Sequence, residues 1–354
     1  MKILLLTKRF PQGRDLLTRP YGRFYHLPRL LAAHGHAIRI ATLGYRGLPT
    51  VEAEFDGLQW SADDVLGKGP YAYWARVMRL CREWQPDWII GGSDTYFGIL
   101  AAKLGARFDI PSAIDAYDDF ESYLPWARPL HAWWRKALAH AELVTAAGPS
   151  LAERLKTHGA RRVEVLPMAA DPAFRPMNRD SCRSLLGLPE GQILVGHLGA
   201  FNASRGHQTV LEAVARWRSM EPGVTLVLTG KDSMRLHRTP GIVALGYLPD
   251  RDMPALVNSL DVACVSLANN AFGRASHPAK LCEAMACGTP VVASDSAPTR
   301  WMLGGDERFL VPLGEVSALA ERLASNALLG QVSYPALPTW PAVASRYEEL
   351  LALD

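Results

Sequence analysis

The sequence has 354 residues, of which 49% are hydrophobic and 21% charged, as in soluble globular proteins. A chain of this length exceeds what one hydrophobic core usually fills, so two domains are expected. It contains no run of about 18 apolar residues that would span a membrane, and its apolar start is too short for a signal peptide. We therefore expect a cytoplasmic protein.

The distribution of charge and the cysteines indicate the kind of partner and the state of the thiols. The formal net charge is +3, yet residues 1–50 hold nine Lys or Arg and a single acid, Asp15. A basic surface of this kind suits anionic partners. The five cysteines are scattered and form no C-x-x-C pair, which favours buried free thiols over disulfides or a zinc site.

The first fifty residues predict a strand, a helix and a second strand. Ile3–Leu6 is a short apolar run typical of a buried strand, the helix runs from about Gly22 to Ala33, and Ala37–Thr42 forms the next strand. The loop after the first strand is unusually long. Ligands bind at the loops that follow parallel strands, so Gly13 or Gly22 could let the backbone approach a phosphate, or both could only serve turns.

An acidic cluster follows a further expected strand at Ile110–Ile114. The segment DAYDDFESY brings together four carboxylates within seven residues, those of Asp115, Asp118, Asp119 and Glu121. The sequence leaves three interpretations open: a metal site, a site for an acceptor substrate, or a solvated turn.

The next stretch, YLPWARPLHAWWRKALAHAEL, places aromatic and basic side chains on one expected helix, namely Trp126, Trp133, Trp134, Arg128, Arg135 and Lys136. Such a helix can lie on an anionic bilayer surface, with its rings at the headgroups and its cations near the phosphates. The alternative is a core helix whose tryptophans face inward.

Prolines stiffen residues 168–190, the expected linker between two domains. The second domain then opens with ILVGHLGAFNASRGHQTVLEAV, an apolar strand, a glycine loop and a helix. Its glycines do not satisfy the G-x-G-x-x-G fingerprint of dinucleotide-binding proteins. The final segment, TWPAVASRYEELLALD, predicts an amphipathic C-terminal helix.

The stretch SHPAKLCEAMACGTPVVAS predicts a helix that leads into a core strand. Pro278 suits the first helical turn and Gly288 suits the left-handed residue that closes a helix. Lys280 and Glu283, three residues apart, share one face. A helix N-terminus attracts anions, so a nucleoside diphosphate could use this cation, this carboxylate and the helix end together. An exposed ion pair on a solvated face is the alternative.

The string P-x-K-L-x-E-A-M-A-x-G-x-P-V-V at residues 278–292 resembles the donor-binding helix of glycosyltransferase family 4, also called the group 1 glycosyltransferases. The resemblance covers most of the chain and is strongest over residues 193–315. It implies an α/β protein of the GT-B fold, with two facing Rossmann-like domains that have parallel sheets and a cleft between them. Residues 1–170 would bind the acceptor, 171–335 would bind a nucleotide-sugar, and 336–354 would form a helix that crosses back to the first domain.

The resemblance assigns roles in donor binding. In this family the lysine lies near the donor phosphates and the glutamate holds the ribose hydroxyls, which implies these roles for Lys280 and Glu283. The family's glycine loop and its Lys-Gly pair match Gly199 and Arg205–Gly206, so Arg205 would supply a second cation. Lys280 and Arg205 would then act catalytically by stabilising the departing diphosphate. Apart from the resemblance, Gly13 is a further candidate for donor binding because of its place in the loop after the first strand.

The resemblance also implies an acceptor site. Tyr117–Asp118 takes the place of an H-D pair that faces the acceptor in the family, so Tyr117, Asp118 and Asp119 are expected to bind it. Asp118 is the candidate base by position, although retaining transfer is often pictured without a protein base. The chain departs from the family pattern at three places: no glutamate stands eight residues before Glu283, Ala200 replaces an arginine, and the histidine of the H-D pair is absent.

The function implied is a retaining transfer of a hexosyl group from a nucleotide-sugar to a hydroxyl of a glycan or lipid-linked intermediate of surface polysaccharide synthesis. No cofactor and no metal are expected, because the two cations and the helix end neutralise the diphosphate. No nucleic acid is expected as a partner, while contact with an anionic membrane would place the protein at the inner face. A non-catalytic partner subunit and a sugar-nucleotide epimerase are the alternatives.

Overall fold

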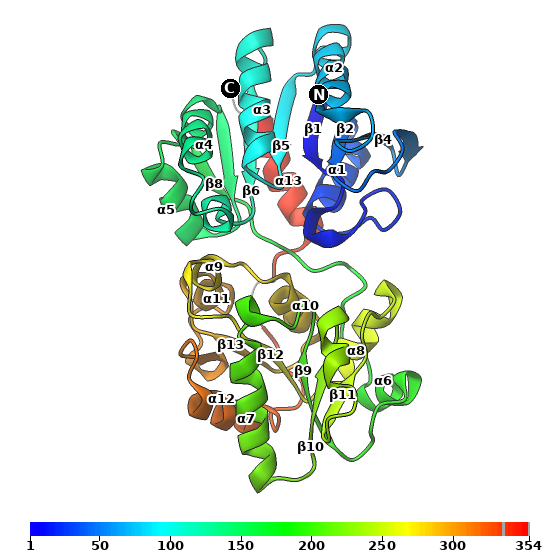
Figure 1. The fold of residues 1–354 in the computed structure, drawn as a ribbon, viewed down its shortest axis with the longest axis vertical. Helices are drawn as coiled ribbons and strands as arrows, with labels where there is room; N and C mark the ends of the chain where they lie inside the picture. Colours follow the sequence, from blue (N-terminus) through cyan, green and yellow to red (C-terminus); the bar gives the residue numbers. More distant parts are fainter. Residues whose placement is uncertain (335–336, 353–354) are drawn as a thin grey trace. The chain divides into compact units, whose positions relative to one another are not determined.

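The structure, a computed structural model, describes residues 1–334 and 337–352. These residues form two compact units, one of Met1–Met168 with the segment from Pro338 onward, and one of Ala169–Leu337. Each unit is a β-sheet flanked by helices (Figure 1). The sequence analysis set the domain boundaries after residues 170 and 335, and the second of these lies outside the described residues.

The sheet of the first unit has eight strands in the order β3-β4-β2-β1-β5-β6-β7-β8. All neighbouring strands are parallel except β3 and β4, which are antiparallel. The strands are β1 (Lys2–Lys8), β2 (Ala37–Gly44), β3 (Val51–Phe55), β4 (Leu58–Asp64), β5 (Trp88–Gly92), β6 (Ser112–Ala116), β7 (Leu143–Ala146) and β8 (Val163–Val165). The expected strand at 110–114 is therefore displaced by two residues, to β6.

The helices of the first unit include the predicted first helix, α1 (Arg23–Ala33), which begins one residue after Gly22. The others are α2 (Gly69–Arg79), which continues as a π-helical turn over Leu80–Trp84, then α3 (Thr95–Phe108), α4 (Arg128–His140), α5 (Pro149–Thr157) and α13 (Trp340–Ala352). Among the described residues, no helix combines the length and the apolar character that crossing a bilayer requires.

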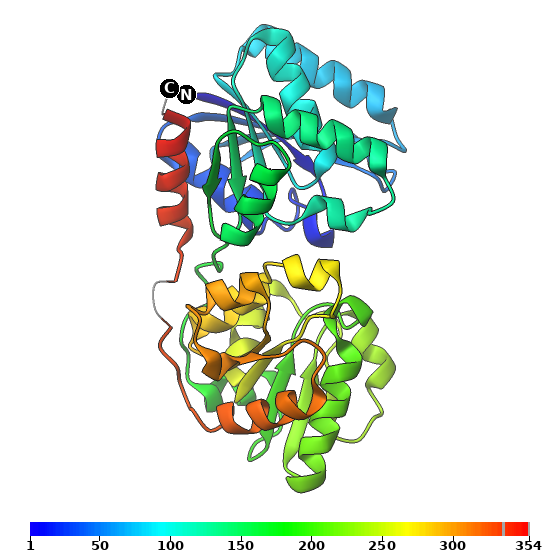
Figure 2. The same ribbon diagram turned by 90° about the vertical axis from the view of Figure 1, so that its left-hand side faces the viewer.

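Helix α13 is the amphipathic helix expected at the C-terminus, and it packs against α1 in the first unit (red in Figure 2). The ring of Trp340 stacks on His26 with the ring centroids 5.4 Å apart. At the other end of α13, the indole of Trp88 donates to the carbonyl of Leu351 at 3.0 Å. These contacts make the last helix part of the first unit.

The second unit has six strands, all parallel, in the order β11-β10-β9-β12-β13-β14. The strands are β9 (Ile193–His197), β10 (Val224–Leu228), β11 (Ile242–Ala244), β12 (Val262–Val265), β13 (Val291–Ser294) and β14 (Leu310–Val311). The helices are α6 (Arg179–Leu186), α7 (His207–Met220), α8 (Met253–Ser259), α9 (Ala271–Ala275), α10 (Ala279–Cys287), α11 (Ala297–Met302) and α12 (Val316–Asn326). This is the parallel architecture that the sequence predicted.

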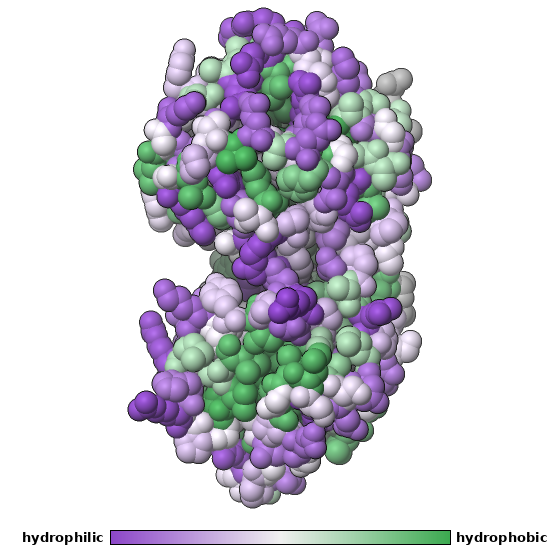
Figure 3. All heavy atoms as spheres, turned by 90° about the vertical axis from the view of Figure 1, so that its right-hand side faces the viewer, coloured by the Kyte–Doolittle hydropathy of each residue, from purple (hydrophilic) through white to green (hydrophobic). Residues whose placement is uncertain are grey.

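Two apolar clusters lie on opposite faces of the second sheet. One packs the sheet against α7 and α12 and the other packs it against α8 and α10. Figure 3 shows apolar residues gathered on the side of this unit that carries α6, α8 and β11. Partly buried side chains such as Leu186, Val243 and Leu248 pack on the cluster that joins α8 and α10 to the sheet. All five cysteines are buried and free, as expected.

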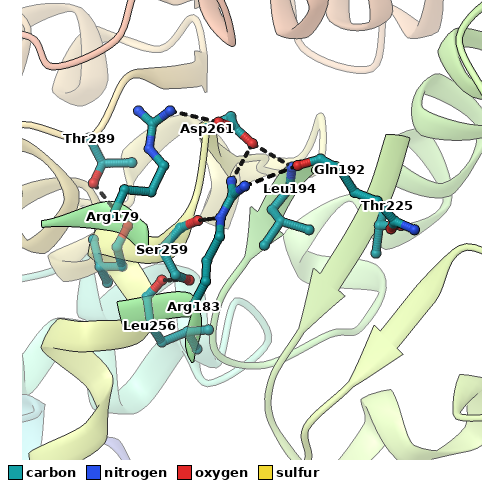
Figure 4. Close-up of polar contacts among 10 residues, drawn as sticks. Arg179, Arg183, Gln192, Leu194, Thr225, Leu256, Ser259, Asp261 and Thr289 are labelled. Carbon is teal, nitrogen blue, oxygen red and sulfur yellow. Dashed lines mark hydrogen bonds and ion pairs between the residues drawn. The ribbon is translucent and has the colours of Figure 1, made fainter. Parts of the chain in front are cut away.

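The buried carboxylate of Asp261 joins the N-terminal ends of β9 and β12 (Figure 4). It accepts hydrogen bonds from the guanidinium groups of Arg179 at 2.7 Å and Arg183 at 2.6 Å, and from the backbone N–H of Leu194 at 2.7 Å. Ligands of parallel sheets bind at the opposite, C-terminal edge. This network therefore stabilises the second unit without taking part in binding.

Candidate active site

The helix α10 begins at Ala279, with Pro278 as its N-cap residue, and it ends at Gly288 in the left-handed conformation, with φ of 69°. The glycine closes the helix as predicted, whereas the proline stands just before the first turn and not within it. No side chain caps the N-terminus. The N–H of Leu281 donates to the carbonyl of Pro278 at 3.0 Å, and the earlier N–H groups of the first turn, at the positive end of the helix dipole, offer an anion-binding position.

Lys280 and Glu283 meet on α10, as their spacing predicts. The Lys280 ammonium lies 2.7 Å from the Glu283 carboxylate. The carboxylate is only 1% exposed, so the alternative of a fully solvated ion pair is wrong. A buried carboxylate is costly unless it is paired, which explains why the ammonium is held against it.

The cysteines of α10 are not candidates for nucleophilic chemistry. Burial, with the Glu283 carboxylate as a smaller cause, raises the pKa of Cys282 and of Cys287 to about 12. Since the thiolate is the reactive form, both thiols stay protonated and serve as small apolar core residues.

The glycine loop that follows β9 lies against Lys280. Gly199 has φ of +104°, and its N–H donates to the hydroxyl of Thr229 at 2.7 Å. A β-carbon placed on Gly199 would stand 3.8 Å from Cε of Lys280. One placed on Gly230 would stand 2.4 Å from the carbonyl oxygen of Gly199. The loops after β9 and β10 therefore meet beside the start of α10.

Arg205 approaches the same region from the 3-10 turn Ala203–Arg205. Its guanidinium lies 3.5 Å from the hydroxyl of Ser276, two residues before Pro278, and 5.2 Å from the centroid of the Phe272 ring. Arg205 thus contacts the segment that leads into α10, and Lys280 lies in the first turn of that helix. The second unit holds Gly199, Arg205, Lys280 and Glu283, four of the five positions expected to bind the donor, and the fifth, Gly13, lies in the first unit.

Two buried histidines, His197 and His277, also lie at this edge. His197 ends β9, and burial, with the charge of Arg205 as a smaller cause, lowers its pKa to about 4. It is therefore neutral at pH 7. His277 lies between Ser276 and Pro278 and is 8% exposed. Only its position directly before the helix-starting proline could have drawn attention to it.

In the first unit, the acidic cluster separates into groups with different partners. Asp115 accepts from Nε of Arg23 at 2.6 Å and from the hydroxyl of Thr145 at 2.6 Å, all within the core. Glu121 accepts two hydrogen bonds from Arg135, at 2.9 and 2.7 Å. Asp115 thus ties α1 to strand β6, and Glu121 ties α4 to the 3-10 turn Phe120–Tyr123. In the part of the chain that the structure describes, no three His, Cys, Asp or Glu side chains form a group that could hold a metal ion.

The other two carboxylates lie directly after β6. Asp118 accepts from the hydroxyl of Tyr123 at 2.7 Å and from the N–H of Asp119 at 3.0 Å. Asp119 lies 3.1 Å from the guanidinium of Arg154 on α5, and burial raises its pKa above the ordinary value although this arginine acts in the opposite direction. The carboxyl with the raised pKa is therefore that of Asp119, which is paired with Arg154, whereas the candidate base by position is Asp118.

Tyr117 lies between two aromatic rings, with the centroids of Phe24 at 5.6 Å and Phe120 at 5.5 Å. Burial raises the pKa of its hydroxyl, so it stays protonated. Gly13 ends the short helical turn that follows β1, with φ of +80°, and its surroundings are open. Gly13, Tyr117 and Asp118 thus all follow strands of the first sheet at their C-terminal ends.

The aromatic helix has features of both a core helix and a helix that lies on a membrane surface. On α4, Trp134 is buried in the core, whereas Trp133 is 59% exposed and Trp126, just before the helix, is 77% exposed. The ammonium of Lys103 lies over the Trp133 ring at 5.4 Å. One tryptophan therefore builds the core, and two stand at the surface with basic neighbours.

Known proteins resemble this chain in sequence and in fold. Residues 192–327 match the family described as glycosyl transferases group 1, and residues 23–169 match the glycosyl transferase 4-like domain. The chain is 26% identical to the 2-deoxystreptamine N-acetyl-D-glucosaminyltransferase of Streptomyces fradiae, over 93% of this chain and 88% of that protein. It is 32% identical to the D-inositol 3-phosphate glycosyltransferase of Rhodococcus erythropolis, but over only 38% of this chain and 33% of that protein.

Among solved structures, Anabaena HepE in complex with UDP superposes with a TM-score of 0.73 at 18% identity, over 99% of this chain and 100% of that one. Sucrose-phosphate synthase from Thermosynechococcus elongatus superposes with a TM-score of 0.74 at 15% identity, over 99% and 98%. These likenesses match the two parallel-sheet units described above. The chain belongs to the group 1, or family 4, glycosyltransferases and has the GT-B fold.

Proposed function

We propose that this glycosyltransferase moves a hexosyl group from a nucleotide-sugar to an acceptor hydroxyl, with retention and without a metal ion. The observation that carries the proposal is the convergence of two cations, Lys280 and Arg205, on the uncapped N-terminus of α10. Backbone N–H groups, an ammonium and a guanidinium suit the oxygens of a diphosphate.

The same groups would drive the chemistry. Negative charge builds up on the diphosphate as the glycosidic bond breaks, and Lys280 and Arg205 would stabilise that charge. Glu283, which holds Lys280 in the unliganded protein, would accept hydrogen bonds from the ribose hydroxyls. Metal ions neutralise diphosphates in other enzymes, and here the two cations and the helix end would take that part.

We propose a uridine diphosphate sugar as the donor. Solved structures of HepE are complexes with UDP, with UDP and glucose, and with UDP-glucose. Those relatives are 17–19% identical to this chain, so the base and the sugar both need a direct test.

The acceptor would bind at the C-terminal ends of the strands of the first unit, where Tyr117 and Asp118 lie. Asp118, held by Tyr123, would orient the acceptor hydroxyl or take its proton. A glycan or lipid-linked intermediate of surface polysaccharide synthesis is the proposed acceptor class. The exposed rings of Trp126 and Trp133, with Lys103 over the Trp133 ring, support peripheral contact with an anionic membrane at its inner face.

A thermal-shift screen over UDP, UDP-glucose, UDP-N-acetylglucosamine and GDP-mannose tests the donor site. A ligand at a hundred times its dissociation constant adds about 2.7 kcal/mol to the stability of the folded protein. Lys280→Ala should abolish the shift, whereas Lys156→Ala should retain it, because Lys156 forms an exposed ion pair of the same spacing with Glu153. An undiminished shift in Lys280→Ala would contradict the assigned site.

A non-catalytic partner subunit is the second candidate. The absence of the histidine before Asp118 and of the arginine at Ala200 favours it. Release of nucleotide from a donor separates the two functions: slow hydrolysis by the purified protein supports the transferase. Donor binding without turnover, with every acceptor extract supplied, supports the partner subunit.

A further inference from the structure

Four side chains outside the sites described so far gather at the C-terminal edge of the first sheet. Lys8 ends β1 and Tyr45 directly follows β2, whereas Asp94 is the second residue after β5 and Tyr96 lies in the first turn of α3. Strand β1 pairs with both neighbours, since Lys8 lies opposite Leu43 of β2 and Leu6 lies opposite Gly91 of β5. The sheet register therefore brings the backbone at Lys8, Tyr45 and Asp94 to the same edge of the sheet.

An ion pair forms the polar part of this group. The Lys8 ammonium lies 2.7 Å from Oδ2 of Asp94, and Oδ1 of Asp94 accepts from the N–H of Tyr96 at 2.8 Å to cap α3. Ser93, which has φ of +74°, accepts from the N–H of Lys8 through its hydroxyl at 2.9 Å. A non-glycine residue in this conformation is costly and is retained where the surroundings impose it. The ion pair is thus held from both strands.

Two tyrosines form the aromatic part. Tyr45 is 46% exposed and Tyr96 is 40% exposed. Partial burial, with the charge of Asp94 as a smaller cause, raises the pKa of both hydroxyls, so both remain protonated donors. The Tyr96 ring packs on Phe97 at 5.3 Å, and Phe97 packs on the fully buried Tyr73 at 6.3 Å. A rigid base therefore supports the Tyr96 ring at the surface.

We propose that Tyr45, Tyr96 and the Lys8–Asp94 ion pair form a subsite for a neutral polyhydroxylated ring of the acceptor, a sugar or a cyclitol. This inference rests on the proposed function, because it concerns the acceptor of the same transfer. Ligand sites combine aromatic walls with a few placed polar groups, and the C–H face of a sugar or cyclitol ring is an apolar surface that can pack on a tyrosine.

The charge at the subsite selects the ligand class. An ammonium paired with a carboxylate has no net charge, so the Lys8–Asp94 pair itself offers no unbalanced charge to an anionic or cationic ring. A hydroxyl group can do both things that the pair offers, since it accepts from the ammonium of Lys8 and donates to the carboxylate of Asp94. Two neighbouring hydroxyls on one ring can therefore bridge the pair.

The nearby acids are engaged elsewhere. Asp64, at the end of β4, accepts from the N–H groups of Arg46, Gly47 and Leu66, each at 3.0 Å. Asp63 accepts from Nε of Arg76 at 2.8 Å. Their carboxylates therefore hold the β4 turn and do not add a second acceptor of hydroxyl protons to the subsite.

Saturation-transfer NMR on the full-length protein with excess UDP tests the proposal, with glucose, N-acetylglucosamine, galactose, mannose and myo-inositol as the probes. The ring C–H protons of at least one probe should receive saturation. Tyr45→Ala and Tyr96→Ala should each weaken its Kd about tenfold, which equals ~1.4 kcal/mol. Tyr45→Phe should weaken it less because the ring remains. Asp94→Asn, which can still cap α3, should also weaken it.

Tyr71→Ala is the matched control. Tyr71 is exposed on α2, and it lies two residues from the buried Tyr73, so it does not share that residue's face of the helix. Its substitution should leave the Kd of the probe unchanged. Absence of saturation in every probe, or equal binding by wild type and Tyr45→Ala, would overturn the subsite.

The UDP thermal shift separates this failure from failure of the proposed function. If UDP stabilises the protein and no probe binds, the subsite is wrong and the donor site stands. If none of UDP, UDP-glucose, UDP-N-acetylglucosamine and GDP-mannose gives a shift in wild type, the proposed donor site itself fails. Retention of the UDP shift in Tyr45→Ala and Tyr96→Ala shows that these variants are folded.

Discussion

Lys280 and Glu283 form an ion pair, 2.7 Å long, across one turn of α10, and the carboxylate lies inside the protein while the ammonium reaches the surface. Removal of one partner therefore has a different energetic cost for the lysine than for the glutamate. The lysine without its partner regains water, whereas the glutamate stays buried with less compensation for its charge.

This asymmetry predicts the effects of single and double substitutions. Lys280→Ala should lower the free energy of unfolding by about 1–3 kcal/mol, because a buried carboxylate loses a charged partner. The double variant Lys280→Ala/Glu283→Gln should recover part of that loss, because the remaining side chain is neutral. Urea unfolding measures both, and a double variant no more stable than Lys280→Ala would refute the explanation.

The network of Asp261 predicts a change in stability without a change in donor binding. Asp261→Ala should lower the free energy of unfolding by about 3 kcal/mol, because Arg183 is buried and loses its carboxylate. The Kd for UDP should not change, since Asp261 lies at the N-terminal edge of the sheet. Glu153→Ala, which breaks the exposed pair with Lys156, is the control and should cost less than about 1 kcal/mol. A weakened Kd for UDP would show that the two edges are coupled.

Local patterns in the sequence predicted α10 well. A proline, an apolar stripe and a glycine mark the start, the buried face and the end of a helix within a few residues, and only the exact place of Pro278 differed. The ion pair of Lys280 and Glu283 could also be predicted, since spacing within one helix fixes it. Its burial could not, because that depends on what the rest of the chain packs against it.

The acidic segment shows why tertiary partners escape prediction from the sequence. Asp115 bonds to Arg23, which is 92 residues away in the chain, and Glu121 bonds to Arg135 on another helix. No local spacing relates these residues. The same limit applies to Tyr45 and Tyr96, which follow different strands. Both reach one edge of the sheet because β2 and β5 flank β1, and no local pattern in the sequence indicates that strand order.

The contact between two glycine loops predicts a defect in donor binding. Gly230→Ala should weaken binding of UDP at least tenfold, because the new β-carbon would stand 2.4 Å from the carbonyl oxygen of Gly199 and would displace that loop. Gly191→Ala is the control, because Gly191 has a similar positive φ of 72° but open surroundings. It should cost about 1–2 kcal/mol of stability from backbone strain alone and leave UDP binding intact. Equal UDP affinity in both variants would contradict the loop contact.

The buried His197 predicts a loss of stability in acid. Its pKa of about 4 in the folded protein lies below the ordinary value near 6.5, because burial disfavours the charged ring. The unfolded chain therefore binds a proton below pH 6.5 that the folded protein does not bind. Stability should decrease as the pH falls from 6.5 to 4, by up to about 3 kcal/mol, and this contribution should level off below pH 4.

Unfolding in urea at pH 7.0, 5.5 and 4.5 measures this dependence. His197→Gln should flatten the profile over that range, because the glutamine has no proton to gain, although its own stability at pH 7 will differ from that of wild type. His237→Gln is the control, since His237 lies at the surface with its ring nitrogen 2.7 Å from the carbonyl of Met234, and it should keep the slope of wild type. If His197→Gln keeps the slope of wild type and His237→Gln loses it, the acid sensitivity comes from the surface histidine. The lowered pKa of the buried His197 would then not be its cause.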